Sequence, residues 1–134
     1  MAPKKAKTEL SSVAMDKDRY LTLLGKLLGE SESLQNDPPN GLIPREDNAS
    51  QHVLEVLKPY TEENGGPLKL ERVAFTPGRS NVIIVYPGQG PESIAFVGSH
   101  MDLVPANPET WKRDPFKMTI EGDEAKKANG SMWA

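Results

Sequence analysis

The first clear hydrophobic period of the chain begins just after Asp16. Apolar residues then recur at positions i, i+3, i+4, i+7 and i+8, the stripe that an amphipathic helix buries. The stripe consists of Tyr20, Leu23, Leu24, Leu27 and Leu28. Asp16 is a suitable N-cap and Gly29 a suitable end, so we predict a helix between them.

A second stripe of the same period lies between residues 46 and 60. It uses Ala49, Val53, Val56, Leu57 and Tyr60. The predicted helix begins at Glu46 and Asp47, whose negative charge suits a helix N-terminus, and Pro59 limits it near its end. The intervening segment, residues 30–44, contains the sequence Asn-Asp-Pro-Pro-Asn-Gly, which cannot continue a helix. We predict an ordered loop there.

Shorter apolar runs of strand length follow the second helix. Residues 68–75 alternate imperfectly between apolar and charged positions, which predicts a half-exposed strand. Residues 81–86 and 93–97 are nearly continuous apolar runs, which favour central strands covered on both faces. For residues 116–121 we predict an edge strand through Met118 and Ile120.

This order of elements predicts the fold class. Two helices followed by three strands are typical of the start of a layered α/β domain, in which the helices cover the sheet. We expect an incomplete domain with two amphipathic helices on a mixed sheet of three to four strands. Residues 1–15 are small, polar and lysine-bearing, and we interpret them as a flexible tail.

Composition narrows the class of protein. The 134 residues suit one domain, and their 37% hydrophobic content predicts a thin core. Sixteen basic against nineteen acidic residues give a net charge of −3, which offers no electrostatic reason for a nucleic-acid partner. No cysteine is present, so disulfides, thiolate metal sites and cysteine nucleophiles are excluded.

The chain also lacks the sequence features of a membrane or secreted protein. Its longest apolar runs, such as residues 82–86, are far shorter than the roughly 20 residues that cross a bilayer. The lysines of residues 1–10 are followed by no apolar stretch, so this is not a secretory signal. We therefore expect a cytoplasmic location and no membrane partner.

The candidate chemistry is concentrated at residues 98–105, Gly-Ser-His-Met-Asp-Leu-Val-Pro. Residues two apart in extended backbone point the same way, so His100 and Asp102 should project together from the carboxyl end of a strand. A neutral imidazole binds zinc or cobalt, and a carboxylate commonly holds its second ring nitrogen. The alternative from the residues alone is a loop histidine that pairs with a nearby acid for structure.

Three other candidates are weaker. Gly88-Gln89-Gly90 is a turn between strands, because a phosphate loop needs a further glycine and a helix behind it. His52 lies inside the second helix, where a surface or satisfied histidine is commoner than a ligand. Ser99 and His100 are adjacent, so on a strand they face opposite ways and form no nucleophile–base pair.

Several longer segments carry a family resemblance. Residues 96–105 and 111–116, with Gly-Arg-Ser-Asn-Val at 78–82 and Leu-Ile-Pro-Arg-Glu-Asp at 42–47, resemble the zinc-dependent metallopeptidase and aminoacylase family. That family includes acetylornithine deacetylase, succinyl-diaminopimelate desuccinylase and glutamate carboxypeptidases. The likeness runs from about Asp18 to Glu124 and is greatest for the eukaryotic acetylornithine deacetylase branch.

The resemblance implies roles for the matching positions. His100 matches a histidine that binds one of two metals, zinc or cobalt, and Asp102 matches the acid that holds that imidazole. Trp111, Pro115 and Phe116 match a segment beside the active-site cleft. We expect these residues to have a packing role rather than a catalytic one. In such enzymes a metal-bound water attacks an amide carbonyl, and the expected reaction releases acetate from N-acetylornithine in arginine biosynthesis.

The resemblance stops after Glu124, which leaves two hypotheses. Relatives continue with a Gly-Arg-Gly-x-x-Asp segment and further ligands, whereas residues 125–134 diverge from that pattern. Residues 16–124 thus resemble the amino-terminal part of a metallohydrolase domain. With one matching metal ligand, we expect the isolated chain to bind zinc weakly and to leave amides uncleaved. The alternative is a non-catalytic binding or assembly module, with a protein partner covering the unfinished sheet.

Overall fold

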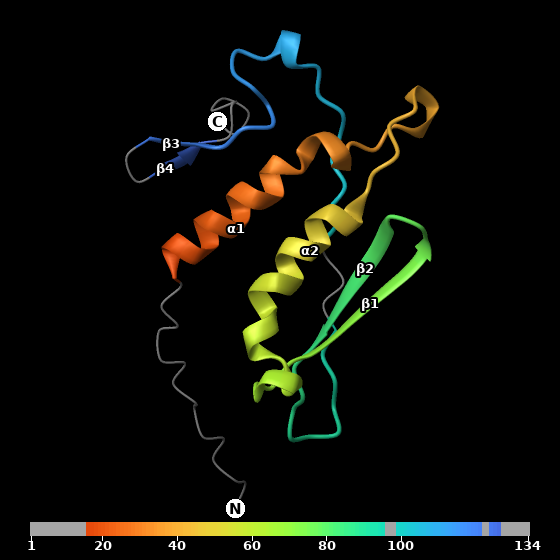
Figure 1. Ribbon diagram of the computed structural model, residues 1–134, viewed down its shortest axis with the longest axis vertical. Helices are drawn as coiled ribbons and strands as arrows, with labels where there is room; N and C mark the ends of the chain where they lie inside the picture. The colour runs from red at the N-terminus through yellow and green to blue at the C-terminus, as the bar shows by residue number, and fades with distance from the viewer. Residues whose placement is uncertain (1–15, 96–98, 122–123, 127–134) are drawn as a thin grey trace, which may run out of the picture.

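The two predicted helices are present and lie side by side (Figure 1). The computed structural model describes residues 16–95, 99–121 and 124–126. Helix α1 spans Lys17–Gly29, and Asp16 caps it by accepting a hydrogen bond from the backbone N–H of Arg19 at 3.1 Å. Helix α2 spans Glu46–Leu57. Both helices are confirmed; the expected tail at residues 1–15 lies outside the described residues.

An antiparallel hairpin follows the helices. Strand β1 (Lys69–Thr76) pairs with β2 (Arg79–Val85), in a register that places Arg72 opposite Val82 and Ala74 opposite Ser80. Gly78 has a φ of 81°, which a residue without a Cβ adopts at low cost in a tight turn. Helix α2 lies between α1 and the hairpin (Figure 1).

Charged side chains fasten the hairpin to α2. Arg79 makes a bidentate contact with Glu46 at 2.6 to 3.1 Å, and Arg72 pairs with Asp47. Asp47 also accepts a hydrogen bond from the backbone N–H of Ser80 at 2.9 Å. The bonds from Ser80, followed by the charge and hydrogen bond of Arg72, lower the pKa of Asp47 against an opposing effect of burial. The acids that suit the N-terminus of α2 therefore also dock the hairpin.

The expectation of two strands covered on both faces is wrong for the described residues. Ile83, Ile84 and Val85 of β2 are 43 to 48% exposed. Residues 93–95 form no strand, and Ile94 is 83% exposed; the rest of that expected strand, residues 96 and 97, lies outside the described part. A central strand needs a neighbour on each edge, and the described residues give β2 only β1.

The expected edge strand is shorter than predicted. Strand β3 (Thr119–Glu121) pairs antiparallel with β4 (Glu124–Lys126), in a separate sheet from the hairpin. The methyl group of Met118, just before β3, lies 3.4 Å from the position that a Cβ on Gly25 would take. The chain before β3 therefore packs against α1. The fold is mixed α/β with an incomplete sheet, which confirms the predicted class.

Short 3-10 turns connect these elements around a thin core. They are η1 (Ser31–Leu34), η2 (Pro38–Asn40), η3 (Lys58–Tyr60), η4 (Glu62–Asn64) and η5 (Pro108–Thr110). The first two lie in the predicted ordered loop between the helices, and η3 contains the proline expected to limit α2. Leu34 and Ala49 are the buried hydrophobic side chains of the described core, beside the buried Pro44.

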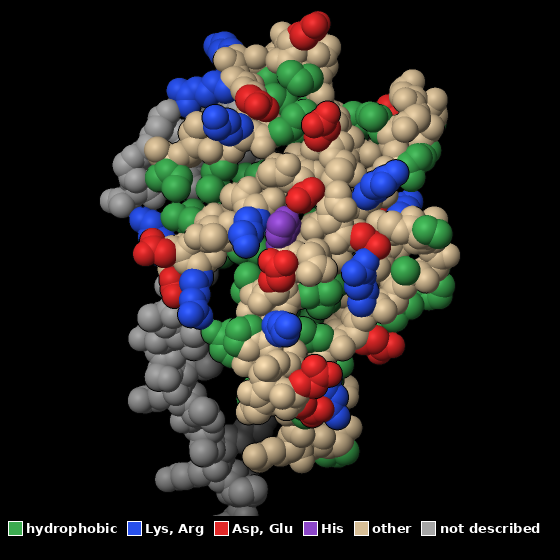
Figure 2. Space-filling model, viewed as in Figure 1, with side chains coloured by type: hydrophobic (Ala, Val, Ile, Leu, Met, Phe, Trp, Pro, Cys, Tyr) green, Lys and Arg blue, Asp and Glu red, His purple; other side chains and the backbone are tan. Residues whose placement is uncertain are grey.

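The surface carries both signs of charge. Figure 2 shows basic and acidic side chains interspersed over the face that carries the helices, with no large area of a single sign. Along the described part of the chain, no helix has the length and apolar content that crossing a membrane requires.

Candidate functional site

His100 and Asp102 contact each other as the spacing predicted. The Nδ1 atom of His100 lies 2.8 Å from Oδ1 of Asp102 and 3.0 Å from the Asp102 carbonyl oxygen. Both oxygens are acceptors, so Nδ1 carries the proton that it donates. The His100 side chain is 83% exposed, against 27% for Asp102. In the neutral imidazole this arrangement leaves the lone pair on Nε2, available to a ligand from outside.

Asn36 holds the other oxygen of the carboxylate. Its Nδ2 donates a hydrogen bond to Oδ2 of Asp102 at 2.6 Å, across 66 residues of sequence. The sequence predicted that Asn36 lies in an ordered loop but gave its side chain no role. No local pattern could have found the contact, because it depends on how two distant loops meet.

The backbone brings these two loops together. The N–H of Asn36 donates to the carbonyl of Leu103 at 2.8 Å, and the N–H of Leu103 donates to the carbonyl of Leu34 at 2.8 Å. The side-chain oxygen of Gln35 accepts a hydrogen bond from the backbone N–H of Ala106 at 3.1 Å. Next to Asp102 the two loops are joined by a short parallel bridge between Gln35 and Leu103, and the end of the strand that the sequence predicted, residues 96 and 97, lies outside the described residues.

The surroundings keep Asp102 charged. The hydrogen bond from Asn36 is the largest cause that lowers the pKa of Asp102; burial opposes it, and the hydrogen bond and charge of His100 add to the lowering. Arg79 has a raised pKa, mainly through its bond to Glu46 and to a smaller extent through the charge of Asp102. An ionised Asp102 accepts from both neighbours at once.

His100 and Asp102 line a cavity of about 670 Å³ beside α2 and the hairpin. Glu46 and Arg79 contribute charged groups to its wall, and Leu27, Val53, Phe75 and Val82 contribute apolar ones. The two charged groups are paired with each other, so the wall combines one ion pair with apolar side chains.

Trp111, Pro115 and Phe116 do not line this cavity. Pro115 is buried, and Trp111 and Phe116 are half-buried. The N–H of Trp111 closes η5 by donating to the carbonyl of Pro108 at 3.2 Å, and the N–H of Phe116 donates to the Asp114 carboxylate at 2.9 Å. In the described residues their backbone forms separate turns, and a place beside the cleft stays a prediction.

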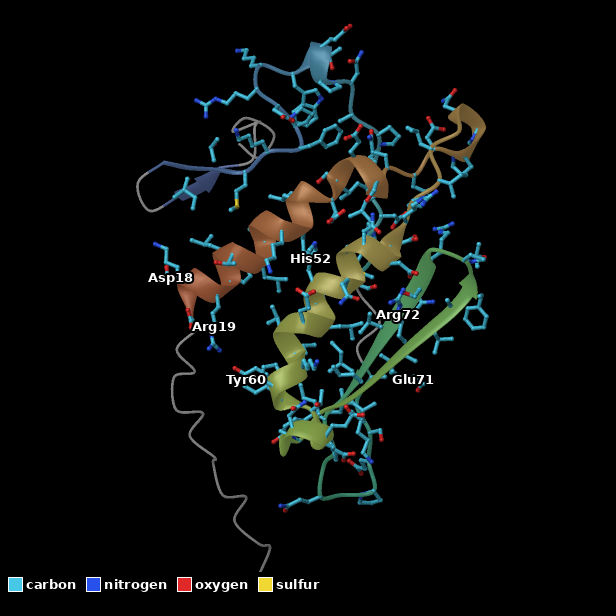
Figure 3. The ribbon with its side chains drawn as sticks, in the orientation of Figure 1. Asp18, Arg19, His52, Tyr60, Glu71 and Arg72 are labelled. Atoms are coloured by element: carbon cyan, nitrogen blue, oxygen red, sulfur yellow. The ribbon has the colours of Figure 1, made fainter. Side chains whose placement is uncertain are left out.

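His52 occupies a different setting. Figure 3 labels it between α1 and α2. Its Nε2 lies 3.0 Å from Oε1 of Glu30, and its Nδ1 is buried with no hydrogen-bond partner among the described residues. At the end of the same interface, Arg19 donates to the Tyr60 hydroxyl at 2.8 Å. His52 therefore contributes to the packing of the two helices through one ring nitrogen, whereas the predicted satisfied histidine would have a partner on both.

The residues present do not by themselves make a catalytic zinc site. Within residues 16–95, 99–121 and 124–126, no three His, Cys, Asp or Glu side chains form a group that could hold a metal ion. Catalytic zinc ordinarily takes three protein ligands and keeps one position open. Here His100 offers one nitrogen, with Asp102 behind it.

Comparison with known proteins tests the resemblance that the motifs suggested. No family model matches the chain, and no solved structure matches it. The chain is 52% identical over 124 residues to acetylornithine deacetylase of Dictyostelium discoideum, covering 86% of this chain and 28% of that protein. It is 53% identical over 113 residues to acetylornithine deacetylase of Arabidopsis thaliana, covering 83% of this chain and 26% of that protein.

A bacterial relative is more distant. Acetylornithine deacetylase of Photorhabdus laumondii is 29% identical over 73 residues, which cover 54% of this chain and 18% of that protein. The chain spans 28% and 26% of the lengths of the two eukaryotic relatives that it matches at 52% and 53% identity. The resemblance is thus confirmed: over the shared stretch, this chain is a homologue of the eukaryotic acetylornithine deacetylases.

Proposed function

We propose that this chain forms the part of a zinc-dependent amidohydrolase that contributes His100 and Asp102. The complete active site would hydrolyse N-acetylornithine, or a related N-acyl amino acid, to the free amino acid and acetate. One observation carries the proposal: Nδ1 of His100 is held at 2.8 Å by Asp102, so that Nε2 of an exposed imidazole is left for a metal. The names of the eukaryotic relatives support the substrate.

Each residue of the pair has a defined task in this proposal. Asp102 keeps the proton on Nδ1 and fixes the plane of the ring, and His100 presents Nε2. Zinc, or cobalt, is the proposed metal of the complete site, to which the described residues bring one ligand. Because ornithine is the precursor of arginine, we assign the reaction to arginine biosynthesis. We also propose a cytoplasmic location.

A chimera tests the proposal. The stretch of the Arabidopsis relative that matches this chain is replaced by the corresponding residues of the chain, and acetate release from N-acetylornithine is measured with zinc present. We expect the chimera to be active and its His100→Ala variant to lose activity by more than about a hundredfold, since a metal ligand has been removed. The 134-residue chain alone should show no turnover.

The second histidine of the chain supplies the control. His52→Ala in the same chimera removes an imidazole that also contacts a carboxylate, but in the helix interface. It should keep most of the activity. An inactive chimera that is folded and binds zinc would contradict the proposed substrate, and equal losses in the two variants would contradict the role of His100.

A second candidate is a non-catalytic binding or assembly module, and the exposed side chains of β2 favour it. Ile83, Ile84 and Val85 are 43 to 48% exposed on a strand whose second edge pairs with nothing in the described residues. Such an edge recruits another chain. An inactive chimera, together with co-purification of the chain and one protein in a fixed ratio, would support this candidate.

A further inference from the structure

Asn36 forms a hydrogen bond with the Asp102 carboxylate, and the same carboxylate forms a hydrogen bond with His100. Its Nδ2 lies 2.6 Å from Oδ2, while Oδ1 lies 2.8 Å from Nδ1 of His100. We infer that Asn36 is a positioning residue that fixes the Asp102 carboxylate and thereby selects the His100 tautomer with its proton on Nδ1. The relevance of this tautomer to a metal rests on the proposed function, whereas the tautomer itself is a property of the chain.

The chemistry of a carboxylate gives such a residue a task. The last torsion of an aspartate is broad, so the plane of the carboxylate can turn away from the imidazole unless a second hydrogen bond holds it. The hydrogen bond from Asn36 occupies Oδ2 and leaves Oδ1 aimed at His100. Together with the Asp102 carbonyl oxygen, 3.0 Å from Nδ1, a carboxylate oxygen fixed in this place holds the proton on the ring nitrogen that faces it.

The position of Asn36 does not depend on its own side chain. Its backbone N–H and that of Leu103 form the bridge between the two loops, with both distances at 2.8 Å. Gln35 adds a side-chain bond to the backbone of Ala106. Replacing the amide of Asn36 should therefore leave the loops in place and remove only the hold on the carboxylate.

The same loop offers a matched control. Nδ2 of Asn40 donates to Oδ2 of Asp37 at 2.6 Å, the same pair of atoms at the same distance, and Asn40 is exposed like Asn36. This pair has no bond to His100 among the described contacts. Asn40→Leu thus removes an equivalent hydrogen bond without touching Asp102.

The experiment measures the ring nitrogens of His100 by ¹⁵N NMR in the complete 134-residue chain, at pH 8, where histidine side chains are ordinarily neutral. The starting chain and Asn40→Leu should show the Nδ1–H tautomer. In Asn36→Leu the ratio of Nδ1–H to Nε2–H should fall about tenfold, as expected for losing a hydrogen bond to a charged group. Asn36→Asp, which is isosteric but has no side-chain N–H, should lower the ratio as well.

Hydrogen exchange of the Leu103 amide separates positioning from simple docking. Protection of Leu103 unchanged in Asn36→Leu, with the tautomer ratio shifted, supports the inference. An unchanged ratio overturns it, and so does a shifted ratio accompanied by loss of Leu103 protection, because the loop would then have moved as a whole. None of these readouts needs turnover or zinc, so an inactive chimera leaves this test intact.

Discussion

His52 and His100 each face a carboxylate at nearly the same distance, 3.0 Å to Glu30 and 2.8 Å to Asp102. The difference lies on the other side of each ring. The second nitrogen of His52 is buried in the helix interface, whereas the His100 side chain is 83% exposed. A histidine–acid pair is therefore no evidence of a metal ligand until the free nitrogen is shown to be reachable.

The two pairs also belong to differently built regions. The helix region, which we define as residues 17–85, contains both α-helices and the hairpin and is fastened by ion pairs. The histidine loop, residues 99–106, has no helix or extended strand and is held by backbone bonds to residues 34–36. The candidate metal ligand His100 thus lies in the histidine loop, which has less regular secondary structure. The conformation of this loop depends on its contacts with the helix region.

Substitution of Leu34 tests how far the histidine loop depends on the helix region. Among the expected effects on the free energy of unfolding, this one should be the largest. The Leu34 side chain is 3% exposed, and its carbonyl accepts the N–H of Leu103. In a core this thin, Leu34→Ala should lower the free energy of unfolding by about 3 kcal/mol. Urea denaturation followed by circular dichroism measures this. Exchange of the Leu103 amide should rise at least in parallel, and a loop that kept its protection would show that it is independent.

The sequence predicted the helix region well because its signals are local. The 3.6-residue stripes and Asp16 predicted α1 and α2, and Gly78 lies in the turn that joins the hairpin. The contact of His100 with Asp102 also followed from spacing alone. The predicted burial of residues 83–85 and the predicted strand at residues 93–95 were wrong, because burial depends on partners elsewhere in the fold.

Asn36 shows the limit of sequence reasoning at the site. Its loop reads as a turn because of its prolines and glycine, and that interpretation is correct, with η2 at Pro38–Asn40. The bond to Asp102 spans 66 residues, and no periodicity encodes it. A partner of this kind becomes visible only when two non-local segments meet.

Replacing each histidine by alanine in turn compares their contributions to stability and to zinc binding. The expected effects are of intermediate size. His52→Ala should lower the free energy of unfolding by about 1 to 2 kcal/mol, because it empties a half-buried position between the helices. His100→Ala should leave that free energy nearly unchanged, since the side chain is exposed. Zinc added to the chain should bind weakly in His52→Ala and should lose that binding in His100→Ala.

Denaturation and zinc-induced NMR shifts of the remaining histidine measure the two effects. The expected result is a reversal: the residue that matters more for stability matters less for zinc. If His100→Ala destabilised the chain as much as His52→Ala and zinc binding survived it, both histidines would be structural. The alternative interpretation of His100, a loop histidine paired for structure, would then hold.

The smallest expected effect concerns the acids of the two regions. Asp47 and Asp102 both have a lowered pKa, Asp47 through Ser80 first and Asp102 through Asn36 first. A carboxylate whose pKa is lowered on folding contributes stability above its unfolded value, ordinarily 3.8, and loses it as the pH falls through the lower folded value. Stability should therefore fall on acidification below about pH 4.

Asp47 joins α2 to β2 within the helix region, whereas Asp102 joins one loop to another. Because of this difference, we expect Asp47 to contribute more than Asp102 to the acid dependence of the unfolding free energy. We expect the histidine loop to open before the rest unfolds, so that its carboxylate reaches its unfolded environment without a change in global stability. Asp47→Asn should accordingly flatten the acid dependence of the unfolding free energy more than Asp102→Asn does. Urea titrations at several pH values between 5 and 2.5 would measure both slopes. Equal flattening would mean that the histidine loop unfolds together with the helices, so that the two regions form one cooperative unit.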